Sequence, residues 1–311
     1  MTILTSPKAF DAQFGPIQER SISSWKKIHP EVDIILFGES PGAAECAERW
    51  GLRHVRQIES SASGVPLFNA IVGYAEENGK FARQVYLNAD ILLPPWFGDV
   101  TNPAGLPEYL IAGQRIDLTE GTIFEPEATG WMRRLEALNG DGKASLHMLS
   151  GSDYFVFPAG LWRDLPPLVI GRGGYDNALL AYCLRRGIPV IDGTLAIPAV
   201  HQWHDYSHVE SKAKEVFFGE DAKANTRNHN IVHGAAYLSH ADRALLGDGT
   251  RVENPRRPLF QKLEVALRFR RNFQLLGYAS RMAWRFLRPI NRLNTRSLSL
   301  GDLIEARRDA A

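Results

Sequence analysis

Short apolar runs and helical repeats alternate along the first two hundred residues of this chain. The run from Val32 to Phe37 is nearly continuous and apolar, as expected for a strand that is buried on both faces. The alternation predicts an α/β fold with a mostly parallel sheet flanked by helices. The predicted strands are residues 2–5, 32–37, 54–55, 85–93, 115–118, 154–157, 189–191 and 196–200, and the predicted helices are residues 18–28, 41–50, 66–77, 127–138 and 176–186.

The predicted strand from Val85 to Leu93 has an unusual centre. Asn88, Ala89 and Asp90 interrupt residues that are otherwise apolar or aromatic. In an inner strand of a parallel sheet, Asp90 would face the crevice at the carboxyl end of the strands, where ligands bind. A carboxylate there could hold a divalent cation that takes its other ligands from substrate phosphates and water. The alternative is an aspartate that caps the following turn.

Two other aspartates begin predicted elements. Asp153 follows Gly151 and Ser152 and precedes an aromatic strand, where it could either contact a sugar or close a turn. Asp176 follows the glycine-rich residues 171–174 and begins a predicted helix. It could cap that helix, or it could reach a ligand near the glycine loop. No Gly-Lys-Ser or Gly-Lys-Thr follows the glycines, so the loop is not a Walker phosphate loop.

Three histidines lie within eight residues, directly after an apolar strand. They are His201, His204 and His208. A single histidine is more often a hydrogen-bonded residue than a ligand, but this clustering favours a metal or phosphate site. The pattern His-Glu-x-x-His is absent, so the sequence does not support a zincin-like hydrolase.

Composition describes an ordinary globular protein. The 311 residues are 44% apolar and 23% charged. Cys46 and Cys183 match no metal-site spacing and are expected to be buried thiols in a reducing compartment. Because the sequence shows neither a secretory signal nor an apolar run long enough to span a bilayer, we expect a cytoplasmic protein.

Charge is distributed unevenly along the chain. Residues 256–296 contain eleven Lys or Arg and one acidic residue, and apolar positions from Val265 to Leu287 follow helical spacing between the arginines. This pattern predicts a basic amphipathic arm that either lies on anionic lipid at the inner face of the membrane or packs its apolar stripe onto the catalytic body. No recognised module accompanies the charge, so nucleic acid is not an expected partner. The predicted divisions are a catalytic domain over 1–215, a connecting segment over 216–255 and the arm over 256–311.

Taken in order, these motifs resemble those of GT-A-type glycosyltransferases, specifically bacterial proteins similar to glycosyltransferase family 2. The resemblance covers about residues 1–210 and implies a Rossmann-like GT-A domain that uses a nucleotide-sugar donor. The order and spacing of the motifs carry it, because no single motif is decisive. The matching stretches are residues 5–8, 34–38, 64–69, 86–90, 151–157, 174–177 and 201–208.

The resemblance implies roles for individual residues. Asp90 holds the last position of the family's Asp-x-Asp metal motif, whereas Asn88 occupies its first position and brings no charge. His201 and His204 would complete a site for Mn²⁺ or Mg²⁺ with Asp90. The nucleotide-sugar is expected to lie near Thr5, Pro7, Lys8, Gly38, Glu39, Asn69, Asn88, Ala89 and Asp90.

The resemblance also places two carboxylates in catalysis. Asp176 matches the base that takes the proton of the acceptor hydroxyl in inverting enzymes, and Asp153 would bind the sugar or the acceptor. A helix N-terminus would lower the pKa of Asp176 and keep it ionised. The expected protein is an inverting, metal-assisted hexosyltransferase of polysaccharide biosynthesis that acts on a glycan or lipid-linked acceptor. The alternatives are a catalytically inactive nucleotide-sugar-binding protein, a metal-dependent phosphoesterase that uses the histidines, and a peripheral membrane scaffold.

Overall fold

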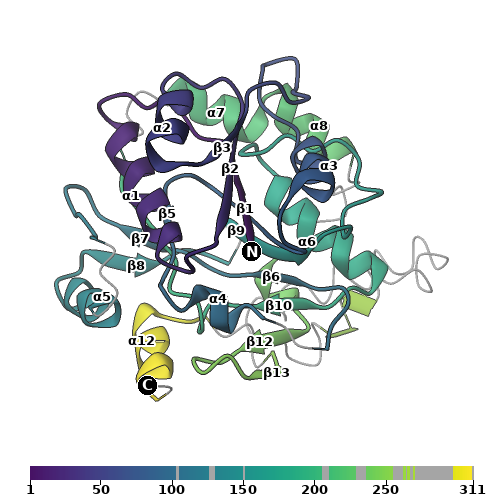
Figure 1. Ribbon diagram of the computed structural model, residues 1–311. Helices are drawn as coiled ribbons and strands as arrows, with labels where there is room; N and C mark the ends of the chain where they lie inside the picture. Colours follow the sequence, from purple (N-terminus) through teal and green to yellow (C-terminus); the bar gives the residue numbers. More distant parts are fainter. Residues whose placement is uncertain are drawn as a thin grey trace.

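The computed structural model contains one large and one small β-sheet with helices around them (Figure 1). It describes residues 1–102, 105–125, 130–149, 151–204, 210–228, 236–254, 262–263, 265–266, 269 and 297–309. The strands are β1 (Thr2–Thr5), β2 (Asp33–Phe37), β3 (Arg53–Val55), β4 (Arg83–Leu87), β5 (Ile91–Leu92), β6 (Leu110–Ala112), β7 (Ile116–Leu118), β8 (Ala144–Leu146), β9 (Tyr154–Pro158), β10 (Val190–Asp192), β11 (Val200–His201), β12 (Arg243–Leu245) and β13 (Arg251–Glu253). The helices are α1 (Phe14–Lys26), α2 (Ala43–Trp50), α3 (Phe68–Asn78), α4 (Phe97–Val100), α5 (Trp131–Gly140), α6 (Tyr175–Arg186), α7 (Glu210–Phe218), α8 (Glu220–Asn228) and α12 (Leu300–Arg308).

The large sheet is mostly parallel, as the sequence predicts. Its nine strands follow the order β13-β12-β10-β6-β9-β4-β1-β2-β3. Strands β3, β2, β1 and β4 are parallel neighbours, and so are β6, β10 and β12. Strand β9 runs antiparallel between these two groups, and β13 is an antiparallel edge strand. The predicted mixed α/β architecture is therefore confirmed.

Helices cover both faces of this sheet (Figure 1). Helices α1 and α2 pack on one face, where Ile22, Trp25 and Cys46 join a core with alternate residues of β1, β2 and β4. Helices α3 and α6 pack on the opposite face, which forms a second apolar core. Because the sheet is buried on both faces, its central strands are the continuous apolar runs that the sequence displays.

One predicted strand is in fact two. The range 85–93 divides after Leu87, where β4 ends, and the chain then enters the small sheet as β5. The small sheet has the order β5-β11-β7-β8. The prediction of one continuous strand was wrong because residues on both sides of the break are apolar and buried, so hydropathy alone does not reveal a change of sheet. The predicted strand over 196–200 is likewise shorter, and only Val200 and His201 form ladder pairs.

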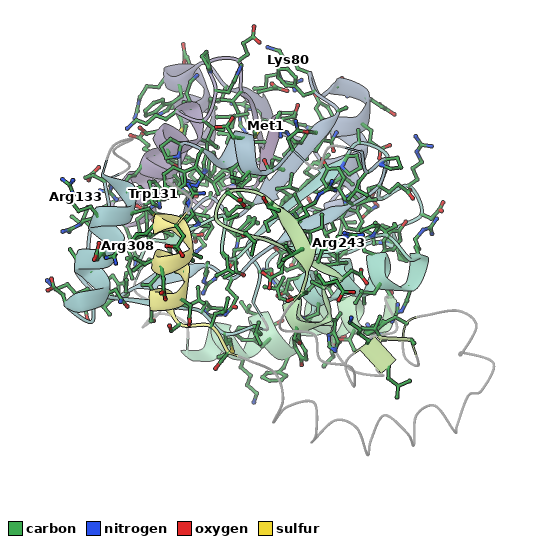
Figure 2. All side chains as sticks on the ribbon, turned by 90° about the horizontal axis from the view of Figure 1, so that it is seen from below. Met1, Lys80, Trp131, Arg133, Arg243 and Arg308 are labelled. Atoms are coloured by element: carbon green, nitrogen blue, oxygen red, sulfur yellow. The ribbon has the colours of Figure 1, made fainter. Side chains whose placement is uncertain are left out.

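A third core lies beneath the small sheet. Helix α5 covers the sheet, and α12 packs beside α5 with Leu300, Leu303 and Ile304 buried (Figure 2). Arg308 of α12 also forms an ion pair with Glu136 of α5. The last helix of the chain is thus part of the folded body.

Strands also occur in the range that the sequence predicts as a connecting segment, 216–255. Strand β12 pairs with β10, so this range extends the large sheet. Most of the predicted basic arm, 256–296, lies outside the described residues. At its beginning, Val265 and Phe269 are buried in the core beneath α6, which is the packing expected if the apolar stripe contacts the body. Among the described residues, no helix has the length and apolar character needed to cross a membrane.

Gly113 follows β6 directly and lies against the side chain of Tyr154 in β9. A Cβ atom at Gly113 would lie 1.9 Å from the Tyr154 hydroxyl oxygen, and the Tyr154 ring is fully buried. We expect Gly113→Ala to lower the free energy of unfolding by about 1–3 kcal/mol, because the buried ring must shift to make room. Urea denaturation measures this change.

The matched control for this substitution is Gly73→Ala. Gly73 lies on the exposed side of α3, and a Cβ there would meet nothing within 4 Å. We expect this variant to be more stable than the wild type by about 0.5–1 kcal/mol, since alanine is the better helix former. Equal stability changes in the two variants would contradict the packing at Gly113.

Candidate active site at the end of strand β4

The Asn88–Asp90 tripeptide joins the two sheets. Strand β4 ends at Leu87, whose carbonyl oxygen accepts a hydrogen bond from the Thr5 hydroxyl at 2.8 Å. The Asn88 backbone N–H then donates to the Asp153 backbone carbonyl oxygen at 3.1 Å, and the next residues turn toward the small sheet. The chain must leave one ladder to enter the other, which places polar side chains between two buried strands. This position explains why an apolar run is interrupted by an amide and a carboxylate.

Strand β11 brings the histidines to the same point. It runs antiparallel to β5, and His201 is paired in register with Ile91, the residue after Asp90. Gln202 holds the following turn, because its backbone N–H donates to the Asp90 carbonyl oxygen at 3.2 Å. Its side-chain amide also donates to the Ile17 carbonyl oxygen of α1 at 2.8 Å.

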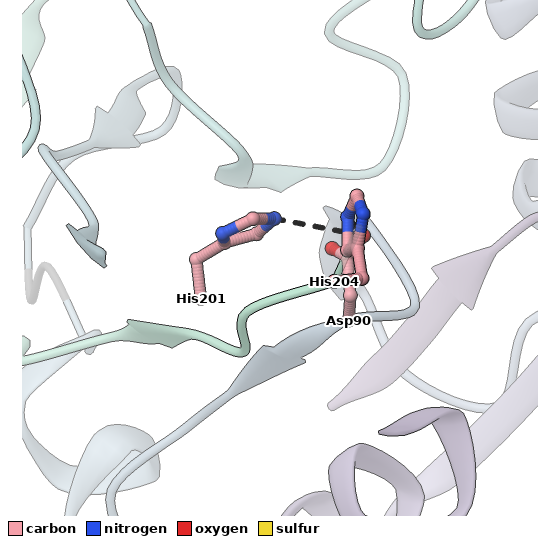
Figure 3. A group of neighbouring side chains, drawn as sticks. All are labelled: Asp90, His201 and His204. Atoms are coloured by element: carbon pink, nitrogen blue, oxygen red, sulfur yellow. Dashed lines mark ion pairs between the residues drawn. The ribbon is translucent and has the colours of Figure 1, made fainter. Parts of the chain in front are cut away.

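Asp90, His201 and His204 converge on one point (Figure 3). Asp90 Oδ2 lies 3.7 Å from His201 Nε2 and 3.4 Å from His204 Nε2. One nitrogen from each imidazole and one carboxylate oxygen all lie within 4.8 Å of one another. Asp90 Oδ1 is buried and has no hydrogen-bond partner among the residues that the structure describes. Two imidazole nitrogens, one carboxylate and an unsatisfied buried oxygen fit a divalent cation such as Mn²⁺.

The electrostatics of the three residues also suit a cation. Burial alone would raise the pKa of Asp90, but the positive charge of His201 and hydrogen bonds with both imidazoles hold it well below its usual range. Burial alone would lower the pKa of His201, whereas the Asp90 and Asp117 carboxylates raise it to about 9. Burial lowers the pKa of His204. The carboxylates of Asp90 and Asp117 thus stabilise a positive charge on His201.

Asn88 and Asp153 form a second polar group beside this site. The Asn88 side-chain amide donates to Asp153 Oδ1 at 2.5 Å, and Arg115 donates to Asp153 Oδ2 at 2.5 Å. Both carboxylate oxygens of Asp153 therefore have partners, and its side chain is held in one orientation. The Asn88 side chain thus fixes one oxygen of Asp153, although it carries no charge itself.

Asp176 lies at the start of α6 and is connected to the same group. Its carboxylate accepts a hydrogen bond from the Ser152 backbone N–H at 3.3 Å. Burial, together with the negative charge of Asp153, raises the pKa of Asp176 to about 7. The expectation that the helix N-terminus would lower this pKa was wrong, because hydrogen bonds from backbone N–H groups offset only part of the cost of burying the charge.

Backbone conformation and packing explain two of the glycines before Asp176. Gly174 is the N-cap of α6 and has φ +83°, a left-handed conformation that glycine adopts without strain. A Cβ at Gly173 would lie 2.9 Å from the Phe217 carbonyl oxygen of α7. At Gly173, the missing side chain therefore makes room for the backbone of α7.

Most of the residues expected near the nucleotide lie at or after the carboxyl ends of β1, β2 and β4. The Ser40 hydroxyl donates to the Pro7 carbonyl oxygen at 2.6 Å, which joins the loops after β1 and β2. Lys8 is exposed, and its ammonium group lies 3.5 Å from Asp90 Oδ2. Gly38 and Glu39 follow β2 on this edge, while Thr5 is fully buried and bonded to β4. Their contact with a nucleotide remains a prediction.

Asn69 occupies a different element from the others. It lies in the first turn of α3 and is only partly exposed. Its side-chain carbonyl oxygen is buried and has no hydrogen-bond partner among the described residues. A role of Asn69 in ligand binding remains a prediction.

Sequence reasoning missed three polar residues of the site. Arg115 and Asp117 come from β7 and its approach, and His147 follows β8. The three contact one another, and Arg115 and Asp117 also contact Asp153 and His201 respectively. The alternation of Arg115 and Asp117 about an apolar residue was the available signal, but only sheet pairing shows what they face. His208, the third histidine of the sequence cluster, lies outside the described residues.

Comparison with known proteins gives similarity in fold only. No protein-family model matches the chain, and no curated protein matches its sequence. A crystal structure of glucosyl-3-phosphoglycerate synthase from Mycobacterium tuberculosis with Mn²⁺, uridine diphosphate and phosphoglyceric acid is 18% identical, covers 69% of this chain and 75% of that chain, and has a TM-score of 0.41. Another crystal structure of the M. tuberculosis synthase is 15% identical, with coverages of 73% and 79% and a TM-score of 0.43. A crystal structure of a mycobacterial protein is 14% identical, with 74% of each chain covered and a TM-score of 0.44.

Proposed function

We propose that this protein is a glycosyltransferase that transfers a sugar from a nucleotide-diphosphate sugar with the help of a divalent cation. The observation that carries the proposal is the convergence of Asp90, His201 and His204 at the carboxyl edge of a parallel sheet. Ligands of open α/β sheets bind at this edge. A buried carboxylate with two imidazoles and an unsatisfied oxygen is a costly arrangement in a protein that binds no ligand.

The cation and the edge of the sheet have complementary tasks in this proposal. Mn²⁺ or Mg²⁺, when bound, would neutralise the charge that develops on the departing nucleoside diphosphate. The Asp90 carboxylate and the two imidazoles would hold that ion. The exposed ammonium group of Lys8, which already lies beside Asp90, supplies a further positive charge for a phosphate group.

Asp176 is the proposed base that takes the proton of the acceptor hydroxyl. Its pKa of about 7 matches the optimum for a base that works near neutral pH. Asp153 is less suited to that task, because Asn88 and Arg115 occupy both of its oxygens. We infer that Asp153 instead orients the sugar or the acceptor. A base on the acceptor side implies inversion at the anomeric carbon.

The proposed acceptor is a glycan or a lipid-linked glycan made at the cytoplasmic face of the membrane. The basic composition of residues 256–296 supports a contact with anionic lipid. Val265 and Phe269 bury the first apolar positions of this arm in the protein core. Val265 and Phe269 are therefore not expected to contact lipid.

A second candidate function is nucleotide-sugar binding without catalysis. The uncharged Asn88 at the first position of the metal motif favours it. The two functions differ in turnover, because an inactive protein would bind the donor without releasing nucleoside diphosphate in the presence of any cation or acceptor.

A thermal-shift screen of nucleotide-diphosphate sugars with and without Mn²⁺ tests the proposal. We expect one class of donor to raise the melting temperature by several degrees only when Mn²⁺ is present, since a ligand at 100 times its Kd adds about 2.7 kcal/mol of stability. Mg²⁺ and EDTA serve as the comparison cation and the metal-free control. No shift with any nucleotide sugar under either condition would contradict a donor site.

A further inference from the structure

A carboxylate lies on the opposite side of His201 from Asp90. His201 presents Nε2 to Asp90 Oδ2 at 3.7 Å and Nδ1 to Asp117 Oδ1 at 3.4 Å. Strand β7 is the parallel neighbour of β11, and the register places Asp117 directly opposite His201. Because the two nitrogens lie on different sides of the ring, a single ring orientation makes both contacts.

Asp117 is itself held in place by two cationic or polar side chains. Arg115 Nε donates to Asp117 Oδ1 at 2.7 Å, and His147 Nδ1 lies 2.6 Å from Asp117 Oδ2. The His147 backbone N–H also donates to the Arg115 carbonyl oxygen at 2.9 Å, which fixes the spacing of these groups. Both oxygens of the Asp117 carboxylate therefore have partners. The carboxylate cannot turn away from His201 without breaking them.

We propose that Asp117 is a positioning residue that holds His201 with Nε2 directed at Asp90, as a ligand for the metal ion. This inference rests on the proposed function. Histidines that bind metals donate their other N–H to a carboxylate or carbonyl, which fixes the ring orientation and the tautomer. An Nδ1–H donated to Asp117 leaves the Nε2 lone pair available to the cation. Asp117 faces the other nitrogen, so it acts through His201 rather than as a ligand of the ion that Asp90 would bind.

Manganese affinity gives the first test. We expect Asp117→Asn to raise the Kd for Mn²⁺ by about 10- to 100-fold, as found when such partners are removed from metal sites. Electron paramagnetic resonance of free Mn²⁺ measures the Kd of the full-length protein. Asp164→Asn is the charge-matched control, because Asp164 is exposed and pairs with Arg186. An unchanged Kd in Asp117→Asn, with Mn²⁺ still bound by the wild type, would overturn the positioning role and leave the proposed function intact.

Imidazole N–H resonances give a second test that does not depend on metal binding. We expect the metal-free wild type, labelled with ¹⁵N-histidine, to show an Nδ1–H proton of His201 that exchanges slowly with water. His201→Ala identifies this resonance by its loss, and Asp164→Asn should retain it. A general effect on the stability of β7 would not remove this resonance selectively.

The outcomes separate the inference from the proposed function. If the wild type binds no Mn²⁺, the metal-assisted function fails, and the Asp117 contact is then judged by the His201 resonance alone. Absence of that resonance in the wild type would overturn the positioning role. If Asp117→Asn does not fold, Asp117→Glu serves in its place. We expect this longer carboxylate to keep a Kd closer to the wild type than Asp117→Ala does.

Discussion

Replacing Asp176 by asparagine is expected to lower the rate of sugar transfer by about 10²- to 10⁴-fold and to stabilise the folded protein at pH 8. The rate falls because an amide cannot accept the proton of the acceptor hydroxyl. The stability rises because burial opposes the charge of Asp176, whose pKa is raised to about 7. At pH 8 the wild type must bury this charge, while the variant buries a neutral group of similar shape.

The sign of the stability change depends on pH. A carboxyl group whose pKa is raised in the folded state binds its proton more tightly there than in the unfolded chain. Its contribution to stability is present below about pH 4 and is lost as the pH rises through about 7. The gain of Asp176→Asn over the wild type should therefore be small at pH 4–5 and reach on the order of 4 kcal/mol at pH 8. Urea denaturation at the two pH values measures it.

The pH dependence of turnover provides the kinetic counterpart. In the wild type, kcat/KM should rise as the pH increases through about 7, because the base acts in its ionised form. In Asp176→Asn this rise should be absent from the residual rate. Asp164→Asn, an exposed carboxylate on the same body, should change neither the rate nor the stability. Wild-type turnover in Asp176→Asn would show that another group is the base.

Replacing Asp90 by asparagine should have a comparably large effect of different origin. We expect the Kd for Mn²⁺ to rise by at least about 100-fold and the transfer rate to fall by about 10²- to 10³-fold, because several kcal/mol of charge stabilisation depend on the bound cation. Asp90 is the acidic member of the site, and both histidines face it. Manganese titration followed by electron paramagnetic resonance and a donor-turnover assay measure the two effects.

Two comparisons make the Asp90 experiment decisive. Circular dichroism must first show that the variant is folded, because Asp90 is buried against two imidazoles. Asp141→Asn is a suitable control, since Asp141 is exposed and pairs with the exposed Lys143. If Asp90→Asn bound Mn²⁺ as tightly as the wild type, the cation would have to bind elsewhere. The proposed site would then be incorrect.

Much of the fold could be predicted from hydropathy because long, repetitive segments carry a clear pattern. The β1–α3 region follows the predicted order, with boundaries that differ by a few residues. Three of the strands of two or three residues, β5, β8 and β11, were missed or misplaced, since so few positions cannot show a period. The break at Asn88–Asp90 was visible in the sequence, whereas the change of sheet behind it was not.

The residues of the candidate site also fall into those that the sequence could predict and those that it could not. Asp90 and His201 could be predicted because each stands out as a polar residue at the end of an apolar run. Arg115 and Asp117 could not, because alternating charged residues are common on exposed strands and only pairing with β11 brings them to His201. The pKa of Asp176 was predicted in the wrong direction because a sequence shows the helix start and not the depth of burial.

The ligands of the proposed metal site come from distant parts of the chain, since Asp90 precedes β5 and His201 ends β11. An ion held between them would close a loop of more than one hundred residues, much as a covalent cross-link does, but reversibly. Chelation would remove this cross-link and leave the loop closed by the pairing of β5 with β11. The ion would thus add a third kind of bond to a junction that already has a strand ladder and the Gln202–Asp90 backbone hydrogen bond.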